Sequence, residues 1–110
     1  MSYAVKKNNI TLTRGDTFKA QIFIKDKEGN MYTPEEGDII EFGMKRDYED
    51  EELLIRKVVP NDTLILRIEP EDTKSLPFGE YVYDMQLTKG NGEVMTFITK
   101  ARLILSEEVC

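Results

Sequence analysis

The sequence has no histidine and no tryptophan, and its one cysteine, Cys110, is the last residue. Proton transfer near neutral pH most often uses histidine, and a cysteine nucleophile needs a base beside it, so these absences argue against an enzyme. A lone thiol also excludes an internal disulfide and a cysteine-based metal site. We therefore expect no catalytic residue, no cofactor and no metal.

Long hydrophobic runs are missing as well. No apolar segment approaches the roughly 20 residues that span a bilayer, and the segment Met1 to Lys7 lacks the apolar core of a secretory signal. The chain carries 21 acidic and 15 basic residues, for a net charge of −6. Because nucleic-acid binding needs clustered Lys and Arg, this balance argues against it. We expect a chain made in a cytoplasm, with neither a membrane nor a nucleic acid as partner.

The sequence does contain apolar residues that alternate with polar ones, which is typical of strands. Its 110 residues suit one domain. We expect a single β-sandwich domain over residues 1–110, with its core at about 9–105 and a short polar tail at 106–110. About seven strands are separated by turn residues. They are expected at 10–12, 18–24, 40–44, 53–59, 64–68, 81–87 and 95–105.

The sequence makes specific structural predictions at three places. Asn91-Gly92 favours a type I′ turn between the last two strands. Residues 72–76 are expected to form a single helical turn. In the last strand, one face that runs from Met95 through Thr99 to Leu105 is expected to keep its phase without a break.

The segment from Leu76 to Tyr83 reads Leu-Pro-Phe-Gly-Glu-Tyr-Val-Tyr. In immunoglobulin-like domains, a tyrosine near the start of a strand bonds through its hydroxyl to backbone a few residues upstream. Leu76, Gly79 and Tyr81 fit the spacing of such a structural corner. We therefore predict an all-β fold, an immunoglobulin-like antiparallel β-sandwich of about seven strands, with the corner in place of a disulfide. The alternative is a plain strand entry without the hydrogen bond.

Val82, Ile98 and Ile104 fall on the solvent phase of the last two strands. Because these strands should pair, the three residues are expected to form one apolar patch on the outer face of their sheet, and such a patch marks association. We take them as a candidate protein interface. The alternative is scattered residues that the stems of Lys and Glu partly cover.

Two further motifs favour plain structural interpretations. Arg14-Gly15-Asp16 is the tripeptide that integrin ligands display, but a tight turn between two strands is expected at this place. The acidic segment 47–52 lacks the alternating ligand spacing of a calcium loop. We expect it to be a solvated loop.

Several segments, taken in order, resemble one known family. They are Ile10 to Thr17, Asp26 to Gly29, Leu76 to Leu87 and Gly92 to Thr96. This order resembles small immunoglobulin-like structural proteins of tailed bacteriophages and prophages, including the N-terminal domain of baseplate upper proteins. The resemblance covers about Ile10 to Leu105.

The resemblance implies a non-catalytic virion or tail-assembly module, without a cofactor, that acts through protein–protein contacts. Its partners would be other virion or tail proteins or further copies of itself. It would be found in the bacterial cytoplasm during assembly and then in the virion. The alternative is a carbohydrate- or cell-surface-binding β-sandwich that serves in adhesion, which aromatic residues exposed in a groove would favour.

Overall fold

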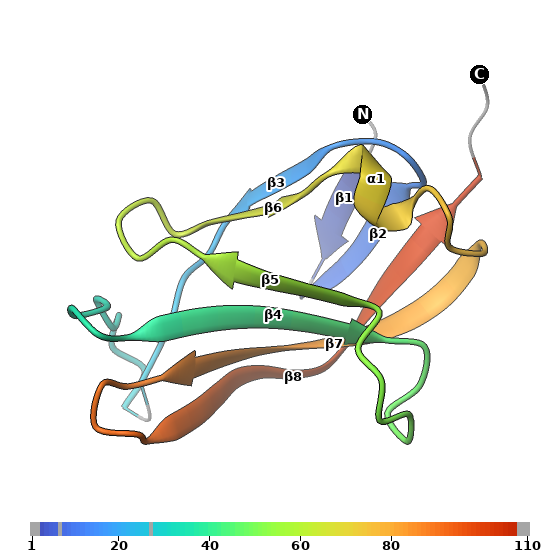
Figure 1. Ribbon diagram of the computed structural model, residues 1–110. Helices are drawn as coiled ribbons and strands as arrows, with labels where there is room; N and C mark the ends of the chain where they lie inside the picture. The colour runs from blue at the N-terminus through green and yellow to red at the C-terminus, as the bar shows by residue number, and fades with distance from the viewer. Residues whose placement is uncertain (1–2, 7, 27, 108–110) are drawn as a thin grey trace.

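A computed structural model describes residues 3–6, 8–26 and 28–107 of the chain. Within these residues it contains eight strands and one short helix (Figure 1). They are β1 (Tyr3–Lys6), β2 (Asn9–Thr13), β3 (Phe18–Gln21), β4 (Ile39–Lys45), β5 (Ile55–Val59), β6 (Ile65–Ile68), α1 (Pro70–Thr73), β7 (Gly79–Thr88) and β8 (Val94–Ser106). The strand β1 was not predicted from the sequence.

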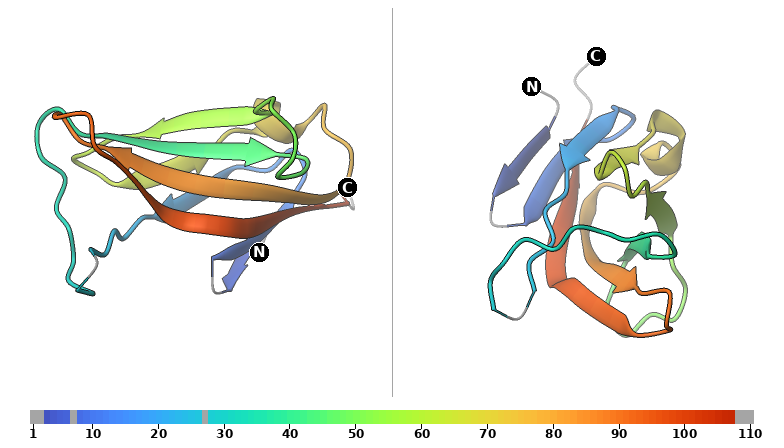
Figure 2. Two further views of the ribbon diagram at one scale, coloured as in Figure 1. Left: turned by 90° about the horizontal axis from the view of Figure 1, so that it is seen from below. Right: turned by 90° about the vertical axis from the view of Figure 1, so that its left-hand side faces the viewer.

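The strands form two sheets that share one hydrophobic core. The large sheet has six strands in the order β1-β2-β8-β7-β4-β5, and the small sheet pairs β3 with β6. Figure 2 shows that the large sheet is curved, with the small sheet on its concave side. We call this concave side the inner face of the large sheet and its solvent side the outer face. The prediction of an all-β fold is confirmed.

Alternation along the strands places the core. In β4, Ile40, Phe42 and Met44 are buried, whereas Glu41 and Lys45 between and beside them are half-exposed. The ring of Phe42 packs against that of Tyr83 in β7, with 5.1 Å between the ring centres. Buried side chains of this size each stabilise the fold by about 1.5–3 kcal/mol. In β4, the period of two in the sequence correctly predicts which residues face inward.

The large sheet is not uniformly antiparallel, which corrects one part of the prediction. β2 pairs with β8 in parallel, with Ile10 opposite Leu103 and Leu12 opposite Leu105. Both strands turn these apolar residues inward, so β2 completes the core on the edge of β8 that β7 leaves open. A parallel pair needs a long connection, and here the rest of the domain provides it.

The predicted unbroken phase of the last strand is wrong. Tyr83 lies opposite Ala101 but Met85 lies opposite Ile98, so β8 contains an extra residue there, as in a β-bulge. The next pair, Gln86 with Thr96, shifts by one more residue. Lys100 adopts a left-handed conformation with φ 53°, and its N–H donates to Oδ1 of Asp84 at 2.9 Å. As a result Thr99 is exposed, and Ile98 turns inward against the core.

The turn between β7 and β8 also differs from the predicted type I′ turn. A type I′ turn needs positive φ at both central residues, but only Gly92 has it, at 94°. The N–H of Gly92 donates to the carbonyl of Lys89 at 2.9 Å, and that of Lys89 donates to the carbonyl of Glu93 at 2.8 Å. This is the pattern of a longer hairpin loop that ends in a left-handed glycine.

The helical turn lies earlier than predicted, at Pro70–Thr73. Proline is favoured in the first turn of a helix because its φ is already helical. The carboxylate of Asp72 accepts the N–H of Glu69 at 2.7 Å, which satisfies a backbone donor at the start of the helix. α1 leads into the corner before β7.

Candidate binding face of the large sheet

The predicted corner has the expected hydrogen bond. The hydroxyl of Tyr81 donates to the carbonyl of Pro77 at 2.6 Å, and Leu76 packs against the core. Gly79 has φ 136°, a conformation that side chains rarely adopt, and Arg46 lies directly over it. The guanidinium of Arg46 also covers the ring of Tyr81, at 4.8 Å from its centre. Arg46 therefore covers the corner at Gly79 and Tyr81.

Arg14-Gly15-Asp16 is part of the same corner. The guanidinium of Arg14 lies 4.0 Å from the centre of the Phe78 ring and donates to the carbonyl of Leu76 at 3.2 Å. The N–H of Gly15 donates to Oγ1 of the buried Thr73 at 2.9 Å. Because Arg14 is held in this way, the tripeptide is a structural turn, as expected from the sequence, and does not form a displayed loop.

The three residues of the candidate interface do not lie together. Val82 and Ile104 lie on the outer face of the large sheet, but the bulge turns Ile98 to the inner face opposite Met85. Val82 is opposite Arg102, and Ile104 is opposite Glu80. The ion pair between Arg102 and Glu80, at 2.9 Å, therefore lies across the line that joins the two apolar residues.

A different apolar cluster occupies the outer face near the β7–β8 hairpin. Ile39, Thr88 and Val94 stand opposite one another on β4, β7 and β8. Val58 on β5 is opposite Glu41 and so is a diagonal neighbour of Ile39. Ile39, Val58 and Val94 are 47%, 58% and 59% exposed, and we call them the outer row. The adjacent apolar pairs Ile39-Ile40 and Val58-Val59 are the signal in the sequence, since strands with one solvated face seldom carry both.

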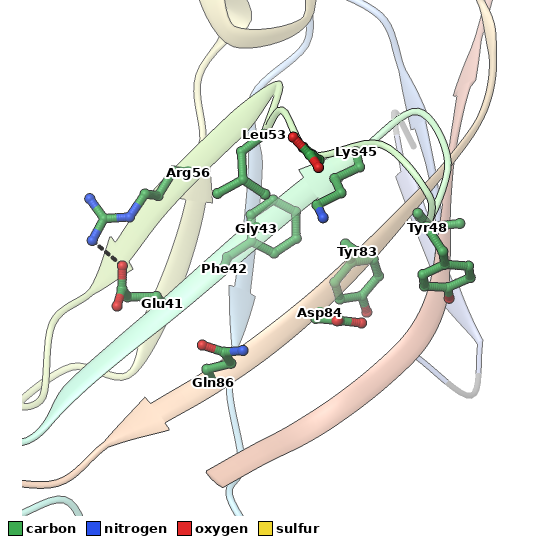
Figure 3. A pocket seen from close by; sticks show the side chains of 12 residues that line it. Glu41, Phe42, Gly43, Lys45, Tyr48, Leu53, Arg56, Tyr83, Asp84 and Gln86 are labelled. Atoms are coloured by element: carbon green, nitrogen blue, oxygen red, sulfur yellow. Dashed lines mark ion pairs between the residues drawn. The ribbon is translucent and has the colours of Figure 1, made fainter. Parts of the chain in front are cut away.

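A pocket of about 380 Å³ lies beside the outer row on the same face. Its floor is Gly43 on β4, which stands opposite Arg56 on β5 and Asp84 on β7. Because Gly43 has no side chain, Leu53 of the following connection packs directly over it, between Arg56 and Asp84 on the neighbouring strands. Figure 3 shows the side chains that surround the pocket, with the Arg56–Glu41 ion pair on one side and Tyr48 on the other.

The connection from β4 to β5 forms one wall of this pocket. Leu53 lies so close over Gly43 that a Cβ atom there would be 3.1 Å from Cδ2 of Leu53. The N–H of Leu54 donates to the carbonyl of Met44 at 2.8 Å, and the N–H of Asp50 donates to that of Asp47 at 3.1 Å. These hydrogen bonds hold Tyr48 and Leu53 against the sheet, so the fold itself fixes the position of this wall.

Several polar groups of the pocket have no partner among the residues that the structure describes. Within the described residues, the side chains of Lys45 and Gln86 and the Oδ2 atom of Asp84 form no hydrogen bond or ion pair. Partial burial raises the pKa of Tyr48, and the charge of Asp84 raises it further while Arg102 opposes the shift. The pocket therefore combines an aromatic ring with free donors and acceptors.

A second polar cluster, by contrast, is internally satisfied. The buried Asp38 accepts the hydroxyl of Tyr32 at 2.6 Å and the N–H of Glu35 at 2.9 Å. The hydrogen bond from Tyr32 holds the pKa of Asp38 below its usual value, and the same bond is the main cause that raises the pKa of Tyr32 to about 12. This cluster fixes the loop before β4 and offers no free group.

The described part of the chain also bears on metal binding and membrane spanning. Among residues 3–6, 8–26 and 28–107, no three His, Cys, Asp or Glu side chains are grouped to hold a metal ion. No helix in that part has the length and apolar character to cross a bilayer. Cys110 lies outside the described residues. No family model matches the chain, and no curated protein or solved structure matches it either.

Proposed function

We propose that the chain is a non-catalytic structural module of a phage or prophage virion or tail assembly, with an immunoglobulin-like fold, that acts through protein–protein contacts. The phage assignment rests on the sequence resemblance of the segments from Ile10 to Leu105. The observation that supports protein–protein contacts is the outer row, in which Ile39, Val58 and Val94 are exposed together on one sheet face.

The strand order supports the immunoglobulin-like part of the proposal. In immunoglobulin domains one sheet contains strands C, F and G with C′ beside them, and the other contains B and E. The orders β5-β4-β7-β8 and β3-β6 match C′-C-F-G and B-E. The hydrogen bond of Tyr81 lies at the start of β7, where these domains carry their tyrosine corner.

The position of the outer row supports a protein partner. It begins on β5, the terminal strand of the large sheet, and terminal strands can also pair with a strand of another chain. A partner that covers the row removes three exposed branched side chains from water, and this stabilises association. The partner is another virion protein or a second copy of this chain.

The test is the double variant Ile39→Lys/Val58→Lys, studied by sedimentation at rising concentration and by co-purification with the products of the neighbouring genes. Loss of an association that the unmodified chain shows is expected, with the melting temperature unchanged. Ile65→Lys is the matched control, because Ile65 is an exposed branched residue on the small sheet. A chain that remains monomeric and binds no neighbouring product contradicts the proposal.

A further inference from the structure

The pocket around Gly43 has charged side chains of both signs. Glu41, Glu51 and Asp84 line it together with Lys45 and Arg56, and Arg56 pairs with Glu41. Because charges of both signs surround the pocket, it has no strong field of one sign that would select an anion or a cation. The pocket therefore favours a neutral ligand.

The free polar groups indicate what such a ligand must offer. The ammonium of Lys45 only donates, Oδ2 of Asp84 only accepts, and the amide of Gln86 does both. All three line the one pocket and bond to no described residue. A neutral ligand that satisfies them needs several groups that donate and accept, as hydroxyl groups do.

The rest of the lining is apolar. Tyr48 is 41% exposed and presents its ring at one side of the pocket (Figure 3). Leu53 and Val82 line the pocket as well. A pyranose ring matches this arrangement, since one of its faces consists of C–H groups and its edge carries hydroxyl groups. The volume of about 380 Å³ lies within the usual range of small-ligand sites, roughly 300–1,000 Å³.

We propose that this pocket binds a neutral pyranose unit of a saccharide, with Tyr48 against the face of the sugar and Lys45, Asp84 and Gln86 on its hydroxyl groups. Bulk water satisfies these three side chains in the free protein, and the sugar hydroxyls replace it. Sugar binding goes beyond the protein contacts of the outer row, and either function stands if the other fails.

The experiment is an NMR titration of the ¹⁵N-labelled chain with methyl glycosides of glucose, galactose, mannose and N-acetylglucosamine. At least one of them is expected to give saturable shifts at the amides of Gly43, Lys45 and Asp84, with millimolar affinity. Glucuronate and glucosamine serve as an anionic and a cationic probe. Both are expected to bind more weakly than the neutral sugar.

Variants locate the binding. Tyr48→Ala is expected to weaken it about tenfold or more, the equivalent of losing one aromatic contact. Asp84→Asn is expected to weaken it while the amide oxygen still accepts the N–H of Lys100 and keeps the bulge in place. Phe23→Ala, which removes an exposed aromatic ring outside this pocket, is expected to leave the affinity unchanged.

Three results would overturn the proposal. One is the absence of saturable shifts with every sugar, on a chain whose spectrum shows that it is folded. Another is binding that persists in Tyr48→Ala or that maps to residues outside the pocket. The third is an extended peptide that shifts the same amides when no sugar does, which would assign the pocket to a protein partner.

Discussion

The two faces of the large sheet differ in whether their polar side chains have hydrogen-bond partners within the protein. On the inner face, the hydroxyls of Tyr81 and Tyr83 donate to the carbonyls of Pro77 and Asn8, and no buried side-chain polar atom among the described residues lacks a partner. On the outer face, Lys45, Gln86 and one oxygen of Asp84 bond to no described residue. An unpaired polar group costs about 1–3 kcal/mol when it is buried but little in water, so folding constrains the inner face and leaves the outer face free to bind.

The largest expected effect on the free energy of unfolding comes from placing a charge on the inner face of β8 and not on its outer face. Ile98 packs against the core and Ile104 is exposed, although the sequence assigns both to the solvent side. Ile98→Asp is expected to lower the free energy of unfolding by about 3 kcal/mol, because it places a charge against apolar neighbours. Ile104→Asp is expected to lower it by less than about 1 kcal/mol. Urea denaturation of both variants measures the difference.

Equal effects of the two variants would contradict the bulge in β8. The comparison also replaces the expectation that Ile98 belongs to an apolar patch on the outer face that binds a partner. Since Ile98 stands opposite the buried Met85, any loss of association in the Ile98→Asp variant would follow from its lower stability.

A smaller effect is expected when one hydroxyl is removed from each face. Tyr81→Phe deletes the bond to Pro77 and is expected to lower the free energy of unfolding by about 1–1.5 kcal/mol. Tyr48→Phe changes an exposed ring and is expected to shift it by less than about 0.5 kcal/mol. Thermal denaturation checks both variants. If Tyr48→Phe lowered the free energy of unfolding as much as Tyr81→Phe does, the pocket wall would stabilise the fold as strongly as the corner.

The sequence predicts the inner face well because burial there depends on residue type. Phe18, Ile40, Met85 and Leu103 are inward in the pattern and buried in the structure. The corner is predictable too, since Leu76, Gly79 and Tyr81 are close in sequence and their spacing is specific. In both cases the determining interactions are local or follow from alternation.

The features that were missed depend on residues far apart in sequence or on backbone conformation. The parallel pairing of Leu12 with Leu105 leaves no local trace. The bulge is hidden because Thr99 is acceptable in either phase, and the left-handed φ of Lys100 has no marker in the sequence. The pocket is hidden because it depends on which residues stand beside Gly43 on neighbouring strands.

The smallest effect on stability is expected at Gly43, which lines the pocket beneath Leu53. Its φ is not in the left-handed range, so alanine fits the backbone. Replacing glycine with alanine stabilises by about 0.4–1 kcal/mol through the unfolded chain, and the contact of the new methyl group with Leu53 offsets this gain. Gly43→Ala is therefore expected to change the free energy of unfolding by less than about 0.5 kcal/mol while it narrows the pocket and weakens sugar binding. Chemical denaturation and the glycoside titration, done on the same sample, measure both. Unchanged sugar affinity would show that the binding site lies away from Gly43, whereas a large loss of stability would show that Leu53 cannot move and that the pocket wall is as tightly packed as the core.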